Sequence, residues 1–328
     1  MNFAFAGTPD FAAWTLAHLD GLGRRPCLVI SRADSPRGRG RKLAAPAAAV
    51  EAERLGLECL QPASINDPAV LEHLGRVGAS ALVVASYGQI LRQPLLDSLL
   101  CLNVHASLLP AYRGAAPIER SLAAGEASTG VSIMRMTERL DEGPWASQRS
   151  VSLGLRDDAG SVGRVLAALG AIGIDQVLTG LSDGTVTWIE QRGPSTYAEK
   201  LCATDCLLDT TRGARAVHDQ VRSLSPRIGA QAASGDLEFK VWRTWPYGQP
   251  GLGAVPGEGA AVADRTGQVQ AGGGRLFIGC AEGAVEVLMI QPGGKGKMAG
   301  SAFLRGYGGR LGDRLNSPAD ECRLDCDD

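Results

Sequence analysis

The first 190 residues alternate between short, continuous apolar runs and longer segments whose apolar positions recur at helical spacing. A run such as 81–85 is typical of a central parallel strand, because both faces of that strand are buried. Alternating strands and helices predict an α/β domain built on a doubly wound parallel sheet. The expected strands span residues 2–6, 26–30, 81–85, 99–104, 129–136 and 148–153, and the expected helices span 11–19, 47–55, 68–77, 117–124 and 159–181.

The pattern changes between Gln191 and Asp209. A helix-like segment at 212–224 is followed by short β-rich runs, separated by Gly and Pro, at residues 237–242, 260–263, 275–280 and 285–291. Short strands with frequent turn signals predict a small β-barrel. We therefore expect an α/β domain at 1–190, a linker at 191–207, a barrel domain at 208–310 and an acidic tail at 311–328.

Charge is unevenly distributed, although the net charge is only -2 at pH 7. Residues 209–310 carry twelve Lys/Arg and eight Asp/Glu, an excess of four positive charges, whereas residues 311–328 carry two Arg and six acids. The near-neutral total excludes a global positive field. A nucleic-acid partner would have to be met by a local basic patch.

The remaining composition is ordinary for a globular chain of 328 residues, with 45% hydrophobic and 21% charged residues. Residues 1–10 lack the basic and apolar segments of a signal peptide or membrane span. Most of the eight cysteines stand singly in apolar runs, and the two x3-spaced pairs, Cys202/Cys206 and Cys322/Cys326, have no nearby histidine to complete a zinc site. We expect a reduced, cytoplasmic monomer without a bound metal and without membrane association.

A basic segment, SRADSPRGRGRKL at residues 31–43, interrupts the α/β pattern. It carries five cationic side chains against one acid, with glycines interleaved, and this composition favours a loop without regular structure. Two interpretations stay open at this point. The segment is either a solvated surface loop or a flexible basic loop that binds phosphates.

Asn103 and His105 stand two residues apart at the end of the apolar strand 99–104. In an extended segment, residues i and i+2 project from the same face, so an amide and an imidazole would share one small volume. The carboxyl ends of such strands are where open α/β sheets bind ligands. Residues 86–89 follow strand 81–85 at the same edge.

These two residues, together with Asp141 in the turn before Gly143-Pro144, form a candidate catalytic set for acyl-type transfer to an amine. Such a reaction passes through a tetrahedral oxyanion, which needs fixed hydrogen-bond donors, and the amine must lose a proton to an acceptor. Asn103 and His105 supply donors, and Asp141 supplies the acceptor. Structural roles are the alternative: a histidine after a strand and an aspartate in a turn are common without catalysis.

Several segments closely resemble the methionyl-tRNA formyltransferases. The two strongest are NVHASLLPAYRGAAPIERSL at residues 103–122 and TGVSIMRMTERLDEG at 129–143. The likeness continues over most of the chain, excluding the acidic tail, in AGTPDF at 6–11, GRGRKL at 38–43, VVASYGQIL at 83–91, YAEKL at 197–201, GKGKM at 294–298 and FLRGY at 303–307. It implies a Rossmann-like catalytic domain and an OB-like C-terminal barrel.

The resemblance also implies a reaction: transfer of the formyl group of 10-formyltetrahydrofolate to the α-amine of methionyl initiator tRNA in translation initiation. Asn103 and His105 would polarise the formyl oxygen, while Asp141 would act as base and position His105. The folate would contact residues of two loops, Ser107, Leu108, Leu109 and Pro110, and Tyr87, Gly88, Gln89 and Leu91. The tRNA acceptor end would be contacted by Arg37, Arg39, Arg41 and Lys42, and the barrel would hold the tRNA backbone.

This sequence departs from the family pattern in two places. Glu142 follows Asp141 where the family commonly has Thr, and the family's Ser-Pro-Trp-Pro segment is replaced by Ser-Pro-Arg-Ile at 225–228. Two other functions remain in competition. One is a folate-dependent formyltransferase acting on a small amine such as an amino sugar nucleotide, which would not need GRGRKL, and the other is a nucleic-acid-binding module without catalysis.

Overall fold

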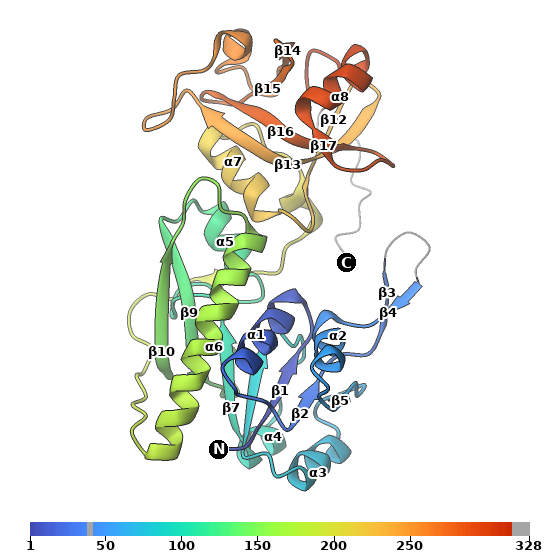
Figure 1. Ribbon diagram of the computed structural model, residues 1–328. Coiled ribbons are helices and arrows are strands. Elements are labelled where there is room, and N and C mark those ends of the chain that lie inside the picture. Colours follow the sequence, from blue (N-terminus) through green and yellow to red (C-terminus); the bar gives the residue numbers. More distant parts are fainter. Residues whose placement is uncertain (38–41, 317–328) are drawn as a thin grey trace. The chain divides into compact units, whose positions relative to one another are not determined.

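The computed structural model describes residues 1–37 and 42–316, and the chain divides into two compact units (Figure 1). The first unit comprises Met1–Pro117, Ser128–Ser152 and Val162–Ala198. The second comprises Ile118–Ala127, Leu153–Ser161 and the chain from Glu199 onward. Each unit has its own sheet, and the exact domain boundaries given above remain predictions.

A seven-stranded sheet in the order β10-β9-β7-β6-β1-β2-β5 forms the centre of the first unit. The strands are β1 (Phe3–Gly7), β2 (Leu28–Ile30), β5 (Cys59–Leu60), β6 (Ala81–Ala85), β7 (Leu100–His105), β9 (Ser128–Arg135) and β10 (Trp145–Ser152). Five of them are parallel, whereas β9 runs antiparallel to β7 and β10 antiparallel to β9. The predicted α/β architecture is confirmed, with a mixed rather than purely parallel sheet.

Helices cover both faces of this sheet. They are α1 (Asp10–Gly21), α2 (Ala47–Arg54), α3 (Pro68–Arg76), α4 (Gln93–Ser98) and α6 (Ala159–Asp183), whose first turn belongs to the second unit. On one face, Val70 and Leu74 of α3 and Leu95 of α4 join a buried cluster with alternate residues of β1, β2 and β6. On the other face, α6 packs on β7 and β9.

Glycines allow α6 to approach that face closely. A Cβ atom on Gly170 would lie 2.5 Å from Val104 Cγ1, and one on Gly173 would lie 2.8 Å from Ile133 Cγ1. Among the described helices, α6 alone is long and apolar enough to cross a membrane, a property of length and composition that core helices share. Here its glycine-bearing side contacts the sheet.

The basic segment contains regular structure that we did not expect. β3 (Ser35–Arg37) and β4 (Lys42–Ala44) form an antiparallel hairpin at its base. The prediction of an irregular loop was wrong here, because a two-stranded ribbon satisfies its backbone groups while leaving side chains such as Ser35 and Leu43 in solvent. Arg39 and Arg41, assigned above to tRNA, lie outside the described residues.

The second unit is built on an antiparallel sheet in the order β12-β13-β16-β15-β14, with β17 paired to β16. Its strands are β12 (Ala230–Ser234), β13 (Leu237–Tyr247), β14 (Val269–Gly272), β15 (Arg275–Gly279), β16 (Ala284–Pro292) and β17 (Met298–Ala299). The helices are α7 (Ala214–Ser223), α8 (Gly300–Tyr307) and most of α5 (Pro117–Ala123). The predicted β-rich C-terminal domain is confirmed and its sheet is antiparallel, whereas its OB-like closure as a barrel stays a prediction.

The expected strand at 260–263 is instead part of a 3-10 helix, η2 (Gly257–Val262). A four-residue apolar run does not distinguish strand from helix, and only Val262 of this run is buried. Further short 3-10 helices are η1 (Ala203–Cys206) and η3 (Gly308–Arg310). The core of the unit gathers Val217 and Val221 of α7, Phe303 of α8 and the inner residues of the sheet.

Candidate active site

Asn103 and His105 occupy the end of β7, which pairs with β6 on one side and β9 on the other. Both side chains reach Asp141, which lies in the turn between β9 and β10. The amide Nδ2 of Asn103 donates to Asp141 Oδ1 at 3.2 Å, and His105 Nδ1 lies 3.6 Å from Asp141 Oδ2. The structure therefore brings together the three residues of the predicted catalytic set, all within the first unit.

The imidazole of His105 is buried and is held by a hydrogen bond at one ring nitrogen, Nε2. Its Nε2 lies 2.9 Å from the carbonyl oxygen of Tyr112, and because a carbonyl only accepts, Nε2 carries the hydrogen. Nδ1 thus faces the Asp141 carboxylate. The 3.6 Å separation exceeds a hydrogen bond, which leaves Nδ1 as the nitrogen able to address a substrate atom.

Asp141 has a left-handed backbone, with φ +53°, a conformation that aspartate tolerates better than most residues. Its Oδ2 accepts a hydrogen bond from the backbone N–H of Gly114 at 2.9 Å. The turn that carries it is tight, because a Cβ atom at Gly143 would clash with the Arg135 carbonyl oxygen. Only glycine fits at that position, and Arg135 N closes the turn by donating to Pro144 O at 2.8 Å.

Glu142, the residue that departs from the family pattern, turns toward two arginines. Its Oε1 lies 3.3 Å from Arg113 Nη1, and its Oε2 lies 3.5 Å from Arg139 Nη1. The extra carboxylate is therefore compensated by cations of the same unit.

The loop Ser107–Pro110, assigned above to folate, is held in place by hydrogen bonds from two polar side chains. Ser132 Oγ donates to Ser107 O at 2.6 Å and accepts from Leu109 N at 3.1 Å, and Gln148 Nε2 donates to Leu109 O at 2.8 Å. The sequence reasoning missed both residues. The one signal that could have found Ser132 was a serine within the apolar strand 129–136, where it is fully buried.

The second loop assigned to folate, residues 87–91, is anchored at several points. The Tyr87 carbonyl accepts from Thr8 Oγ1 at 2.8 Å, and Gln89 bonds to the backbone of Ile65 and Ala63. Gly88 is exposed with φ +84°, whereas the Tyr87 and Leu91 side chains are buried.

The buried Tyr87 hydroxyl has no hydrogen-bond partner in the part of the chain that the structure describes. Burial raises the pKa of Tyr87 to about 12, so the phenol stays neutral and keeps its proton to donate. Within those residues, no group of three His, Cys, Asp or Glu side chains is arranged to hold a metal ion.

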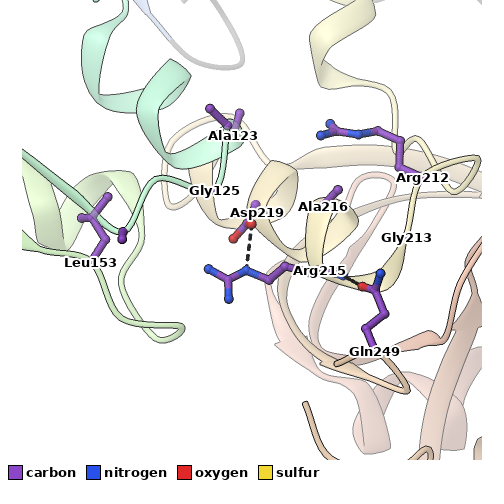
Figure 2. Close-up of a pocket in the computed structure, with 11 residues that line it drawn as sticks. Ala123, Gly125, Leu153, Arg212, Gly213, Arg215, Ala216, Asp219 and Gln249 are labelled. Carbon is purple, nitrogen blue, oxygen red and sulfur yellow. Dashed lines mark hydrogen bonds and ion pairs between the residues drawn. The ribbon is translucent and has the colours of Figure 1, made fainter. Parts of the chain in front are cut away.

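A separate cavity of about 610 Å³ lies in the second unit (Figure 2). Small residues form much of its wall, and Arg212 and Arg215 supply positive charge. Arg215 Nε donates to Asp219 Oδ2 at 2.8 Å, and the backbone N–H of Arg215 donates to Gln249 Oε1 at 2.6 Å.

Comparison with known proteins shows which family this chain belongs to. Residues 1–178 match the formyl transferase family model, and residues 200–308 match the model of the formyl transferase C-terminal domain. A methionyl-tRNA formyltransferase of Rubrobacter xylanophilus is 46% identical over 311 residues, covering 94% of this chain and 97% of that protein. The chain belongs to the methionyl-tRNA formyltransferase family. A second family member, from Methylococcus capsulatus, is 37% identical over 95% of this chain and 100% of its own length.

Solved structures outside the methionyl-tRNA formyltransferase family share the fold. HypX from Aquifex aeolicus in complex with tetrahydrofolic acid gives a TM-score of 0.62 at 13% identity, covering 99% of this chain and 50% of HypX. The N-formyltransferase from Helicobacter canadensis, in complex with folinic acid and dTDP-3-aminofucose, gives 0.60 at 14% identity, covering 89% of this chain and 99% of that one.

Proposed function

We propose that this enzyme transfers the formyl group of 10-formyltetrahydrofolate to the α-amine of methionyl initiator tRNA. The observation that carries the proposal is the convergence of Asn103, His105 and Asp141 at the end of β7, in a chain 46% identical to a methionyl-tRNA formyltransferase. In this reaction the amine nitrogen bonds to the formyl carbon, and the bond from that carbon to the folate nitrogen breaks.

Asn103 and His105 stabilise the negative charge that develops on the formyl oxygen. The Asn103 amide has two hydrogens and uses one toward Asp141, so the second is free to donate to that oxygen. The His105 ring is fixed by Tyr112 O, and its Nδ1 edge donates when protonated. These groups are held in place before substrate arrives, which is what makes such donors effective.

Asp141 accepts the proton that the attacking amine must lose. A carboxylate offers about four lone-pair positions, and the Asn103 and Gly114 donors occupy two of them. Capacity therefore remains for a proton from the amine, directly or through a water.

The folate donor lies along the two anchored loops, with contacts from Ser107, Leu108, Leu109 and Pro110 and from Tyr87, Gly88, Gln89 and Leu91. The exposed, left-handed backbone at Gly88 offers an uncrowded backbone to a ligand. Solved proteins that share this fold hold tetrahydrofolic acid or folinic acid.

The tRNA is contacted by the basic segment, through Arg37, Arg39, Arg41 and Lys42, and by the second unit. Residues 209–310 carry an excess of four positive charges, and Arg212 and Arg215 line the cavity of that unit. We also propose that the enzyme is cytoplasmic and monomeric. A small-amine acceptor is the weaker alternative, because full-length relatives at 46% and 37% identity are methionyl-tRNA formyltransferases.

One acceptor comparison tests the function. The full-length protein is incubated with 10-formyltetrahydrofolate and either charged initiator tRNA, charged elongator tRNA or a nucleotide-linked amino sugar, and formylated product is quantified. We expect formyl-methionyl-tRNA from the initiator substrate. Preferred formylation of the sugar, or binding of tRNA without turnover, would overturn the proposal.

A further inference from the structure

The segment from Gln191 to Ala198 contacts both loops that carry or orient the catalytic groups. At its start, Gln191 Nε2 donates to two backbone carbonyl oxygens of the catalytic turn, those of Asp141 and Gly143, at 2.8 Å each. One side-chain amide thus spans the turn on both sides of Glu142. Both acceptors lie in the first unit, as Gln191 does.

Arg113 fixes the other end of the Gln191 amide. Gln191 Oε1 accepts from Arg113 Nε at 3.1 Å and from Nη2 at 2.8 Å, and Arg113 Nη1 lies 3.3 Å from Glu142 Oε1. All hydrogen-bonding groups of the Gln191 side chain are therefore engaged. These hydrogen bonds fix the orientation of the Gln191 side-chain amide. The amide in turn holds the backbone of the Asp141 turn.

The far end of the same segment holds the loop at 112–115. Thr196 accepts from Tyr112 N through Oγ1 at 2.8 Å and from Arg113 N through its carbonyl at 2.9 Å, and β11 (Tyr197–Ala198) pairs with β8 (Arg113–Gly114). This loop supplies the Tyr112 carbonyl that binds His105 and the Gly114 N–H that binds Asp141.

We propose that Gln191 is a positioning residue for the formyl transfer, holding the Asp141 turn in register with His105 through its anchor on Arg113. The inference rests on the proposed function and deepens it, since Gln191 acts on the backbone of the Asp141 turn rather than on the Asn103, His105 or Asp141 side chains. Asp141 is the residue most sensitive to a shift of the turn, because the left-handed backbone of the turn aims its carboxylate at the Asn103 and Gly114 donors. A displacement of about 1 Å in such a group can cost on the order of 10²-fold in rate.

Two substitutions test the role of the Gln191 donors. Gln191→Leu removes both donor and acceptor at similar volume, whereas Gln191→Glu removes the donors but keeps an acceptor for Arg113. For both variants we expect kcat to fall by about 10- to 100-fold while KM for 10-formyltetrahydrofolate and for tRNA changes less than about threefold, because all hydrogen-bonding groups of the Gln191 side chain are engaged with the protein itself.

The second unit offers a matched control in Gln220. Its Nε2 also donates to two backbone carbonyls, Asp205 O at 3.0 Å and Leu207 O at 2.6 Å, and its Oε1 accepts from Asp209 N at 3.0 Å. Gln220→Leu should lower thermal stability and leave kcat unchanged. An equal loss of kcat in this control would show a general effect of stability and overturn the positioning role.

Two further readouts separate positioning from mere folding. Amide hydrogen exchange at Gly114, whose N–H binds Asp141, should accelerate in Gln191→Leu, while exchange in β1 should not change. Arg113→Met combined with Gln191→Leu should cost no more kcat than the worse single variant, because the two residues act as one unit. Wild-type kcat in both Gln191 variants overturns the inference alone, whereas an inactive wild-type protein overturns the proposed function.

Discussion

At the scale of single residues, the site is organised around the Asp141 carboxylate. It contacts an amide, an imidazole and a backbone N–H, and the amide and the N–H come from positions 38 and 27 residues earlier in the chain. The cluster is buried, with His105 at 5% and Asp141 at 8% exposure, so its electrostatic interactions are stronger than they would be in water. The site therefore depends on the orientation of these side chains as much as on which residues they are.

His105→Ala is the first prediction at this scale. The substitution removes one preorganised donor to the formyl oxygen, and loss of one such donor costs on the order of 10²–10³ in kcat. Single-turnover formylation with saturating folate and tRNA measures the loss. His18→Ala, at an exposed position of α1, serves as control and should retain wild-type kcat. Near-normal turnover without the His105 imidazole would reject its role.

How far the sequence predicts this site depends on the kind of group. Asn103 and His105 could be paired from strand periodicity alone, because residues i and i+2 share a face. Asp141 was joined to them only by the chemistry needed and by resemblance, since nothing local relates positions 103 and 141. The Tyr112 carbonyl and Gly114 N–H could not be predicted, because every residue has such groups and only the fold selects among them.

At the scale of elements, α6 packs against one face of β7, the strand that carries Asn103 and His105. The sequence predicted this helix despite its glycines, and the structure gives a reason for two of them: Gly170 and Gly173 meet Val104 and Ile133. Val104 lies between Asn103 and His105, so the distance from α6 to β7 sets the placement of the site. Missed elements such as β3 and β4 are only three residues long and have no periodicity to detect.

Gly170→Ala should therefore disturb both stability and catalysis. The new Cβ would lie 2.5 Å from Val104 Cγ1, and such overpacking costs about 1–3 kcal/mol. Denaturant unfolding should show a lower midpoint, and kcat should fall because β7 must shift. Gly75→Ala in α3, where a Cβ meets nothing within 4 Å, is the control and should raise stability by about 0.5–1 kcal/mol. Equal midpoints for both variants would contradict the packing argument.

Helix α7 contains a buried histidine, His218, that should make the free energy of unfolding depend on pH. His218 is buried, with Nδ1 3.0 Å from Thr244 Oγ1 and Nε2 2.8 Å from Leu155 O, and burial lowers its pKa below 6.5. The unfolded chain then binds a proton at a pH where the folded chain does not, so the free energy of unfolding should fall as pH drops below about 6.5. Urea midpoints at pH 7.5 and 5.5 measure this slope. His218→Gln should reduce the slope, and an unchanged slope would refute the assignment.

At the scale of the whole molecule, positive and negative charges are concentrated in different segments of the chain, and the net charge is small. The basic segment 31–43 and residues 209–310 are positive, and residues 311–328 are negative, within a total of -2. Attraction of a polyanion then depends on local cations. Each Lys or Arg that neutralises a phosphate releases counterions and steepens the dependence of binding on salt.

The tRNA proposal is therefore best tested by salt. Arg39→Ala with Arg41→Ala, and separately Arg212→Ala in the cavity of Figure 2, should weaken tRNA binding and lower the slope of log K against log salt by about 1 for each phosphate that is no longer neutralised. Affinity for 10-formyltetrahydrofolate should be unchanged. Arg54→Ala, which removes an exposed cation paired with Glu51, controls for net charge and should leave the slope intact. An equal loss of folate affinity, or wild-type slopes in the loop and cavity variants, would show that the tRNA is held elsewhere.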